Sequence, residues 1–302
     1  MLAPAVLTGI AAGASVFVAT IVAVFFLLQH GGSFDRMRSE AAGLPDHAGE
    51  QKPLLYDALL ATARALPMRP APLPDSAGLR GERVMLRDFQ GIADADALFR
   101  ISNGEPHDGV YRGLQFDADE MIWAHLAHGP FATARAFAAL YCEQQAPDAR
   151  HYVLATLGDE PIGMLTLSNH APRDLRVQID SLWLTPAFQG TGALVEAALL
   201  LLTHLFESVG YRRVEWCCDG HNVRARRAAH ALGFAFEGVL RKHRIVKDCN
   251  RDTVVFAAIN SAWPAMKEQL EMKRRRAAQA AAQDSRAIAR EANEELKKKR
   301  ER

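Results

Sequence analysis

A predicted strand, a loop with two glycines and a long apolar helix follow one another directly between residues 177 and 209. The strand is predicted at 177–184 and the helix at 193–209, and Gly190 and Gly192 lie in the loop between them. The helix is apolar on several faces, so it should be buried against a sheet. A strand that leads straight into such a helix predicts a domain of the α/β class.

Further strands and helices extend this domain on both sides. The elements predicted before the central unit are a strand at 83–89, a helix at 94–102 and a β-hairpin with strands at 151–157 and 162–168. The elements predicted after it are a strand at 214–219, a helix at 223–232 and two closing strands at 234–239 and 254–259. Strands dominate first and helices then connect later strands, which is a mixed α/β order.

The most apolar segment of the chain is its N-terminus, where residues 3–28 carry no charge. A helix rises about 1.5 Å per residue, so this segment is long enough to cross a hydrocarbon core of ~30 Å. We predict a single transmembrane anchor. The alternative is a cleaved signal peptide, but no basic region precedes the run, and the run is longer than the usual apolar region of such a peptide. Arg36 and Arg38 follow the run, so the positive-inside rule favours a cytoplasmic location for the part of the chain after it.

The chain is therefore divided into four predicted segments. They are a transmembrane anchor at 3–28, a proline-rich tether at 31–81, a globular domain at 82–266 and a charged helical tail at 267–302. The tail carries twelve Lys or Arg and seven Asp or Glu, without Gly or Pro, so we expect a solvated helix. Attraction of the tail to acidic lipid headgroups or to RNA is the alternative.

Overall charge and cysteine content narrow the function classes. The formal net charge is only +1, so nothing in the composition calls for nucleic acid, and a nucleic-acid partner is not expected. No two of the four cysteines have the C-x2-C spacing of a structural zinc site, and we expect no metal. We predict that all four are free thiols in a reducing compartment.

The glycine loop is the first segment with a chemical signature. Gln189-Gly190-Thr191-Gly192 opens directly into the long helix. Backbone N–H groups of such a loop converge on one point, the helix start adds partial positive charge, and glycine lets the backbone approach a phosphate. The loop is therefore a candidate pyrophosphate cradle, although it is neither a Walker A loop nor a dinucleotide-binding fingerprint. Asn222 is predicted to cap the helix at 223–232 and could present its amide to a ligand.

Together, these motifs resemble the Gcn5-related N-acetyltransferase superfamily, whose acetyl-CoA loop has the pattern Q/R-x-x-G-x-G/A. The segment Gln189–Leu194 fits this pattern except that Leu194 replaces the final small residue. The sequence is most similar to the branch of ribosomal-protein N-terminal acetyltransferases. That similarity rests on Asn222, Leu232-Gly233-Phe234 and Glu237-Gly238, and the resemblance spans roughly residues 83–270.

The resemblance implies a mixed, mostly antiparallel central sheet with flanking helices. This sheet is splayed between its fourth and fifth strands, which are the strands predicted at 177–184 and 214–219. The resemblance also implies that acetyl-CoA is the co-substrate and lies in this splay, while an acetyl group passes directly to a primary amine of a small molecule or a protein N-terminus. The residues that it assigns to the cofactor are Leu182, Leu184, Gln189, Gly190, Thr191, Gly192, Ala193, Asn222 and Arg226. Oligomeric state is not implied.

The sequence departs from the family where the reaction needs a base and an acid. The fourth strand of relatives usually begins Glu-Ile-Gly-His, and here Gln178 replaces the glutamate and cannot accept a proton at neutral pH. Asp180 lies two residues further along, on the same strand face, and could substitute. Ala225 replaces the serine that often assists the leaving group in relatives.

The candidate catalytic residues are therefore Asp180, Glu237 and His243, the last two because they match positions in the close relatives. Two functions remain open. One is a membrane-tethered N-acetyltransferase, and the other is a catalytically degenerate acyl-CoA-binding or partner-binding module at a membrane.

Overall fold

A computed structural model of the chain describes residues 78–143 and 148–300. Two compact units, 1–66 and 67–302, make up the chain, and all described residues belong to the second. The predicted anchor at 3–28 and nearly all of the tether lie outside the described residues, so both stay predictions. Within the described ranges, no helix is both long and apolar enough to cross a membrane.

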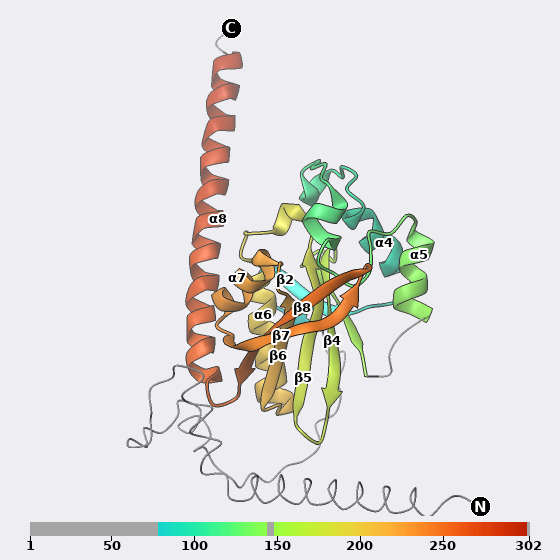
Figure 1. The fold of residues 1–302 in the computed structure, drawn as a ribbon. Coiled ribbons are helices and arrows are strands. Elements are labelled where there is room, and N and C mark those ends of the chain that lie inside the picture. Colours follow the sequence, from blue (N-terminus) through green and yellow to red (C-terminus); the bar gives the residue numbers. More distant parts are fainter. Residues whose placement is uncertain (1–77, 144–147, 301–302) are drawn as a thin grey trace, which may run out of the picture. The chain divides into compact units, whose positions relative to one another are not determined.

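An eight-stranded sheet forms the centre of the domain (Figure 1), in the order β1-β2-β3-β4-β5-β6-β8-β7. Its strands are β1 (Leu79–Arg80), β2 (Val84–Asp88), β3 (Arg150–Thr156), β4 (Pro161–Ala171), β5 (Arg176–Leu184), β6 (Arg213–Asp219), β7 (Ala235–Val246) and β8 (Cys249–Ile259). Only β5 and β6 run parallel, and all other neighbours are antiparallel. The predicted mixed, mostly antiparallel sheet is confirmed.

Helices cover both faces of the sheet (Figure 1). The α-helices are α4 (Ile92–Ser102), α5 (Ala134–Ala138), α6 (Ala193–Thr203), α7 (Val223–Leu232) and α8 (Trp263–Arg300). Shorter helical turns are η1 (Gly109–Tyr111), η2 (Asp119–Trp123), η3 (Ala139–Glu143), η4 (Pro186–Phe188) and η5 (His204–Val209). One core contains α4, η2 and α5, and the other contains α6, α7 and the start of α8.

Strand β3 shows how one sequence serves both cores. Tyr152 and Leu154 are buried in the core under α6, whereas Val153 and Ala155 are buried in the core under α4. Side chains alternate across a strand, so a strand that is covered on both faces is apolar at successive positions. This explains the continuous apolar run of β3.

Local sequence signals placed α7 correctly. The Asn222 side chain accepts a hydrogen bond from the Ala225 N–H at 2.9 Å and caps the helix, as predicted. Gly233 ends the helix in the left-handed conformation with φ of 94°, where glycine avoids the steric cost of a Cβ. The closing strands are longer than predicted, because β7 and β8 form a hairpin that turns at Lys247 and Asp248.

The two ends of the domain differ from the sequence-based expectation. Strand β1 lies inside the predicted tether and pairs with β2, so the sheet begins before residue 82. At the other end, α8 begins at Trp263 and continues without a break past residue 267. Leu270 is buried in the same core as α6, so the expectation of a solvated helix from residue 267 is wrong at this position.

Candidate active site

Strands β5 and β6 part in the middle of the sheet. Their parallel pairing runs only from Arg176–Ile179 on β5 and Arg213–Trp216 on β6, although both strands continue further. The pairing stops where β5 has one extra residue relative to β4, beside Ser181, which has φ of 46°. A β-bulge of this kind bends the strand and removes a residue from the ladder. The backbone of β5 beyond Ile179 therefore faces the gap without a strand partner on that side.

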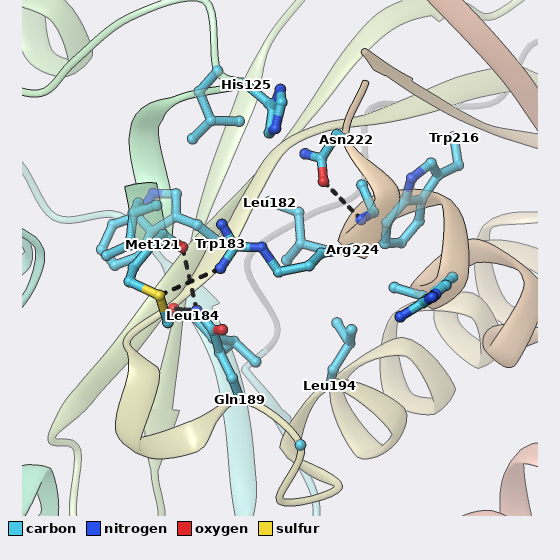
Figure 2. Close-up of a pocket in the computed structure, with 16 residues that line it drawn as sticks. Met121, His125, Leu182, Trp183, Leu184, Gln189, Leu194, Trp216, Asn222 and Arg224 are labelled. Atoms are coloured by element: carbon cyan, nitrogen blue, oxygen red, sulfur yellow. Dashed lines mark hydrogen bonds between the residues drawn. The ribbon is translucent and has the colours of Figure 1, made fainter. Parts of the chain in front are cut away.

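A cavity of about 370 Å³ occupies this gap (Figure 2). Residues 182–184 of β5 line it together with Gln189 and Gly190 of the glycine loop. The first turns of α7 line the cavity on one side, and residues between 121 and 126 line it on the side opposite α7. Its volume is in the range of pockets that bind small molecules and cofactors.

The glycine loop is held by its own side chains. The Gln189 amide donates to the Leu184 carbonyl at 2.9 Å, and the Thr191 hydroxyl donates to the Phe188 carbonyl at 2.8 Å. Gly192 precedes α6 in the left-handed conformation, and no side chain caps this helix. Backbone amides at the start of α6 therefore remain as the groups that can hold an anion.

The residues predicted to bind the cofactor do not all reach the cavity. Leu182, Leu184, Gln189, Gly190 and Asn222 line it. Thr191, Gly192 and Ala193 do not line it, and Ala193 is buried beneath the loop. Asn222 uses its side-chain oxygen for the helix cap, and among the described residues its side-chain NH2 has no hydrogen-bond partner, so that group can face a ligand.

The arginines of α7 lie around two pockets. Arg224 lines the cavity, Arg226 lines a separate groove between α7 and strands β7 and β8, and Arg227 lines both. Arg226, the arginine predicted to bind the cofactor, does not line this cavity, whereas its neighbours Arg224 and Arg227 do. Figure 2 shows Arg224 extending toward Met121, and its guanidinium also donates to the Glu120 carbonyl.

The three candidate catalytic residues do not line one cavity together. Asp180 lines a smaller cavity of about 40 Å³ that shares lining residues with the larger one, and its carboxylate accepts from the Ser181 N–H at 2.7 Å. Glu237 accepts two hydrogen bonds from Arg213, at 2.8 and 2.6 Å. Arg213 is the first residue of β6 and lies in the part of the strand that still pairs with β5.

Glu237 and His243 therefore lie outside the cavities. Hydrogen bonds from Arg213 outweigh the opposing effect of burial and hold the pKa of Glu237 below its usual value, as expected for a structural ion pair. His243 lies on β7 with its Nδ1 at 2.9 Å from the Thr253 hydroxyl, and it lines neither cavity. Of the three candidates, only Asp180 lines either cavity.

The structure also places functional groups that the sequence did not single out. His125 lines both cavities, and Asp219 lines the smaller one. No local motif marks His125, because it lies in a turn far along the chain from the glycine loop. Asp219 carries a weak signal, since it ends a strand three residues before the capping asparagine.

Two cysteines lie at the smaller cavity. All four cysteines are free, as predicted, and Cys217 and Cys218 line the smaller cavity. Burial raises the pKa of Cys217 and of Cys218 to about 11, so both are protonated at neutral pH. Within the described part of the chain, no group of three or more His, Cys, Asp and Glu side chains is arranged to hold a metal ion.

Comparisons with known proteins identify the family. A GCN5-related N-acetyltransferase from Brucella melitensis has 30% sequence identity and a TM-score of 0.60, over 67% of this chain and 87% of that chain. A probable acetyltransferase of the GNAT family from Chromobacterium violaceum ATCC 12472 has 32% identity and a TM-score of 0.60, over 68% and 96%. The ribosomal-protein-serine acetyltransferase of Escherichia coli (strain K12) is 29% identical over 101 residues, which are 33% of this chain.

The match to the Escherichia coli protein spans 56% of that protein, so only about half of its length is covered. The family model of the acetyltransferase (GNAT) domain matches residues 83–235. This match covers half of the chain and includes the parted strands, the glycine loop and α7. The chain therefore belongs to the GNAT family of acetyltransferases.

Proposed function

We propose that the domain transfers an acetyl group from acetyl-CoA to a primary amine, by direct transfer while both substrates are bound. The observation that carries this proposal is the cavity between β5 and β6, which runs from the parted strands to the glycine loop. The acceptor is a small amine or the amino terminus of a protein. The name of the Escherichia coli relative favours the second class.

The chemical groups around the cavity suit the parts of acetyl-CoA. The backbone of β5 at Leu182 has no partner on β6 and can hydrogen-bond to the amides of the pantetheine arm. A Cβ placed on Gly190 would meet nothing within 4 Å, so the loop has open space beside its backbone for a diphosphate. Arg224 and Arg227 add positive charge for the phosphates.

Direct transfer is favoured over a covalent acyl-enzyme. A cysteine nucleophile must be a thiolate, and burial keeps Cys217 and Cys218 protonated at neutral pH. With both substrates bound side by side, orientation alone contributes several kcal/mol to the rate. The replacement of the usual glutamate and serine by Gln178 and Ala225 then leaves proton transfer to other groups.

Titration calorimetry with acetyl-CoA and a thiol-release assay test this proposal on the full chain. The acceptor panel contains polyamines, amino acids and peptides with free amino termini, including one that begins with serine. We expect saturable cofactor binding, and thiol release that depends on one class of acceptor. Cofactor binding without release from any acceptor would favour the degenerate acyl-CoA-binding module instead, and absence of binding would refute both.

We further propose that residues 3–28 tether the domain to a membrane as a single pass, with the catalytic domain in the cytoplasm. The support is the uncharged apolar run in the sequence and the basic residues that follow it. The full chain should remain in the membrane pellet after alkaline carbonate extraction, and a chain that begins at residue 78 should be released. Release of the full chain would refute the tether.

A further inference from the structure

A histidine and a carboxylate meet at the junction of the two cavities. His125 Nδ1 lies 3.4 Å from Asp219 Oδ2, and the two side chains are only 28% and 17% exposed. His125 lines both cavities, and Asp219 is the last residue of β6, beyond the point where this strand leaves β5. Figure 2 shows His125 across from Asn222, on the side of the cavity opposite α7.

The turn that carries His125 is held firmly. Trp123, two residues earlier, is buried, and its indole N–H donates to the Ser102 carbonyl at 3.0 Å. Its own carbonyl accepts from the Leu126 N–H at 3.0 Å and from the Lys247 ammonium at 2.8 Å. The imidazole is therefore positioned by the core on one side and by Asp219 on the other.

Asp219 is suited to orient a histidine. Burial opposes its ionisation, but the hydrogen bond from the His221 N–H, the contact with His125 and the positive charge of Arg251 outweigh burial. Together they hold the pKa of Asp219 below its usual value, so it is a carboxylate at neutral pH. A carboxylate next to Nδ1 favours the tautomer with the proton on Nδ1, which leaves Nε2 as the basic nitrogen. Among the described residues, Nε2 has no hydrogen-bond partner.

We propose that His125, oriented by Asp219, accepts the proton of the acceptor amine during acetyl transfer. This inference rests on the proposed function. As the amine nitrogen forms its bond to the thioester carbon, the C–S bond breaks, and Nε2 takes the proton that the nitrogen loses. Asp219 stabilises the imidazolium, which then returns the proton to the departing thiolate. The sum is an amide and a free thiol, with no other reactant.

The other ionisable groups around the pair are less suited to this role. Cys217 and Cys218 are protonated thiols, and Arg251 is a cation. Asp180 lines the smaller cavity but not the larger one, and its carboxylate already accepts from the Ser181 N–H. His221 also approaches Asp219, with Nδ1 at 3.5 Å from Oδ1, but its side chain is 82% exposed and lines neither cavity.

His221 supplies a matched control. Both histidines contact the same carboxylate, and His221→Ala keeps the backbone N–H that donates to Asp219. We expect His125→Ala to lower kcat by about 100-fold or more, the usual contribution of a general base, with the Kd for acetyl-CoA unchanged within about twofold. Asp219→Asn should lower kcat less, because the base remains, and His221→Ala should leave kcat unchanged.

The pH profile and chemical rescue distinguish proton transfer from a structural role. Wild-type kcat should fall toward acid pH, and His125→Ala should lack this acid limb. Added imidazole should restore part of the activity of His125→Ala. If His125→Ala does not fold, His125→Gln is interpreted in the same way.

Three results would overturn the proposal. The first is full activity in a folded His125→Ala variant, and the second is an acid limb that survives in it. The third is a loss of activity in Asp180→Asn while His125→Ala keeps its activity. Failure of the proposed function looks different, because wild-type protein would then fail to bind acetyl-CoA or to release thiol before any variant is compared.

Discussion

Replacing Gly192 with alanine tests how α8 supports the glycine loop. Gly192 has φ of 87°, and a Cβ on it would overlap the Cβ of Ala277 on α8. The left-handed conformation costs an alanine about 1–2 kcal/mol. Forcing a methyl group into a filled space costs about 1–3 kcal/mol more. Gly192→Ala should therefore lower the free energy of unfolding by about 2–5 kcal/mol.

Gly190 is the matched control, since it lies in the same loop with φ of 75° but has nothing within 4 Å of where a Cβ would stand. Gly190→Ala should cost only the conformational part, about 1–2 kcal/mol. The difference between the two variants isolates the packing of the loop on α8. Urea unfolding of both variants, followed by circular dichroism, measures it.

A second change separates the two contributions at Gly192. Ala277→Gly removes the opposing methyl group and costs about 1 kcal/mol of helix propensity by itself. In that background, Gly192→Ala should lose its packing penalty and cost about as much as Gly190→Ala. Equal costs for Gly192→Ala and Gly190→Ala in the wild-type background, or no relief from Ala277→Gly, would refute the reasoning.

Three further predictions concern charged side chains. Arg224→Ala should raise the Kd for acetyl-CoA about tenfold in titration calorimetry, since one charged hydrogen bond contributes ~1.5 kcal/mol. Arg226→Ala should leave this Kd unchanged, because the Arg226 side chain lines the other groove. Hydrogen bonds, first from Lys267, hold the pKa of Glu207 below its usual value, so the stability they add is present above about pH 4.3 and is lost as the pH falls further. Unfolding midpoints of wild type and Glu207→Gln should therefore converge at acid pH, and divergence there would contradict the assignment. Glu237→Gln should leave kcat unchanged in the thiol-release assay, and a large loss would return this residue to the active site.

Local patterns in the sequence predicted most of the elements because each pattern is satisfied within a few residues. Asn222 and Gly233 delimit α7 through a cap and a left-handed stop, and both signals act on neighbouring backbone groups. The glycine loop was recognisable for the same reason, since its conformation depends on Gly190 and Gly192 themselves. The family resemblance then joined these local motifs into one expected fold.

The sequence was less informative wherever a residue's role depends on a distant partner. Charge in the tail suggested a solvated helix, but burial of Leu270 depends on α6, which supplies an apolar surface. Glu237 matched a family position, yet its role is set by Arg213 across the sheet.

The candidate site shows the same division. The sequence by itself determined the glycine loop, the capped helix and the strands that flank the gap, because short-range backbone geometry encodes them. Only the tertiary structure decided which side chains meet there. His125 and Asp219 come together because a buried tryptophan fixes one turn and a bulged strand opens the sheet beneath it, and neither condition can be read from the residues next to them.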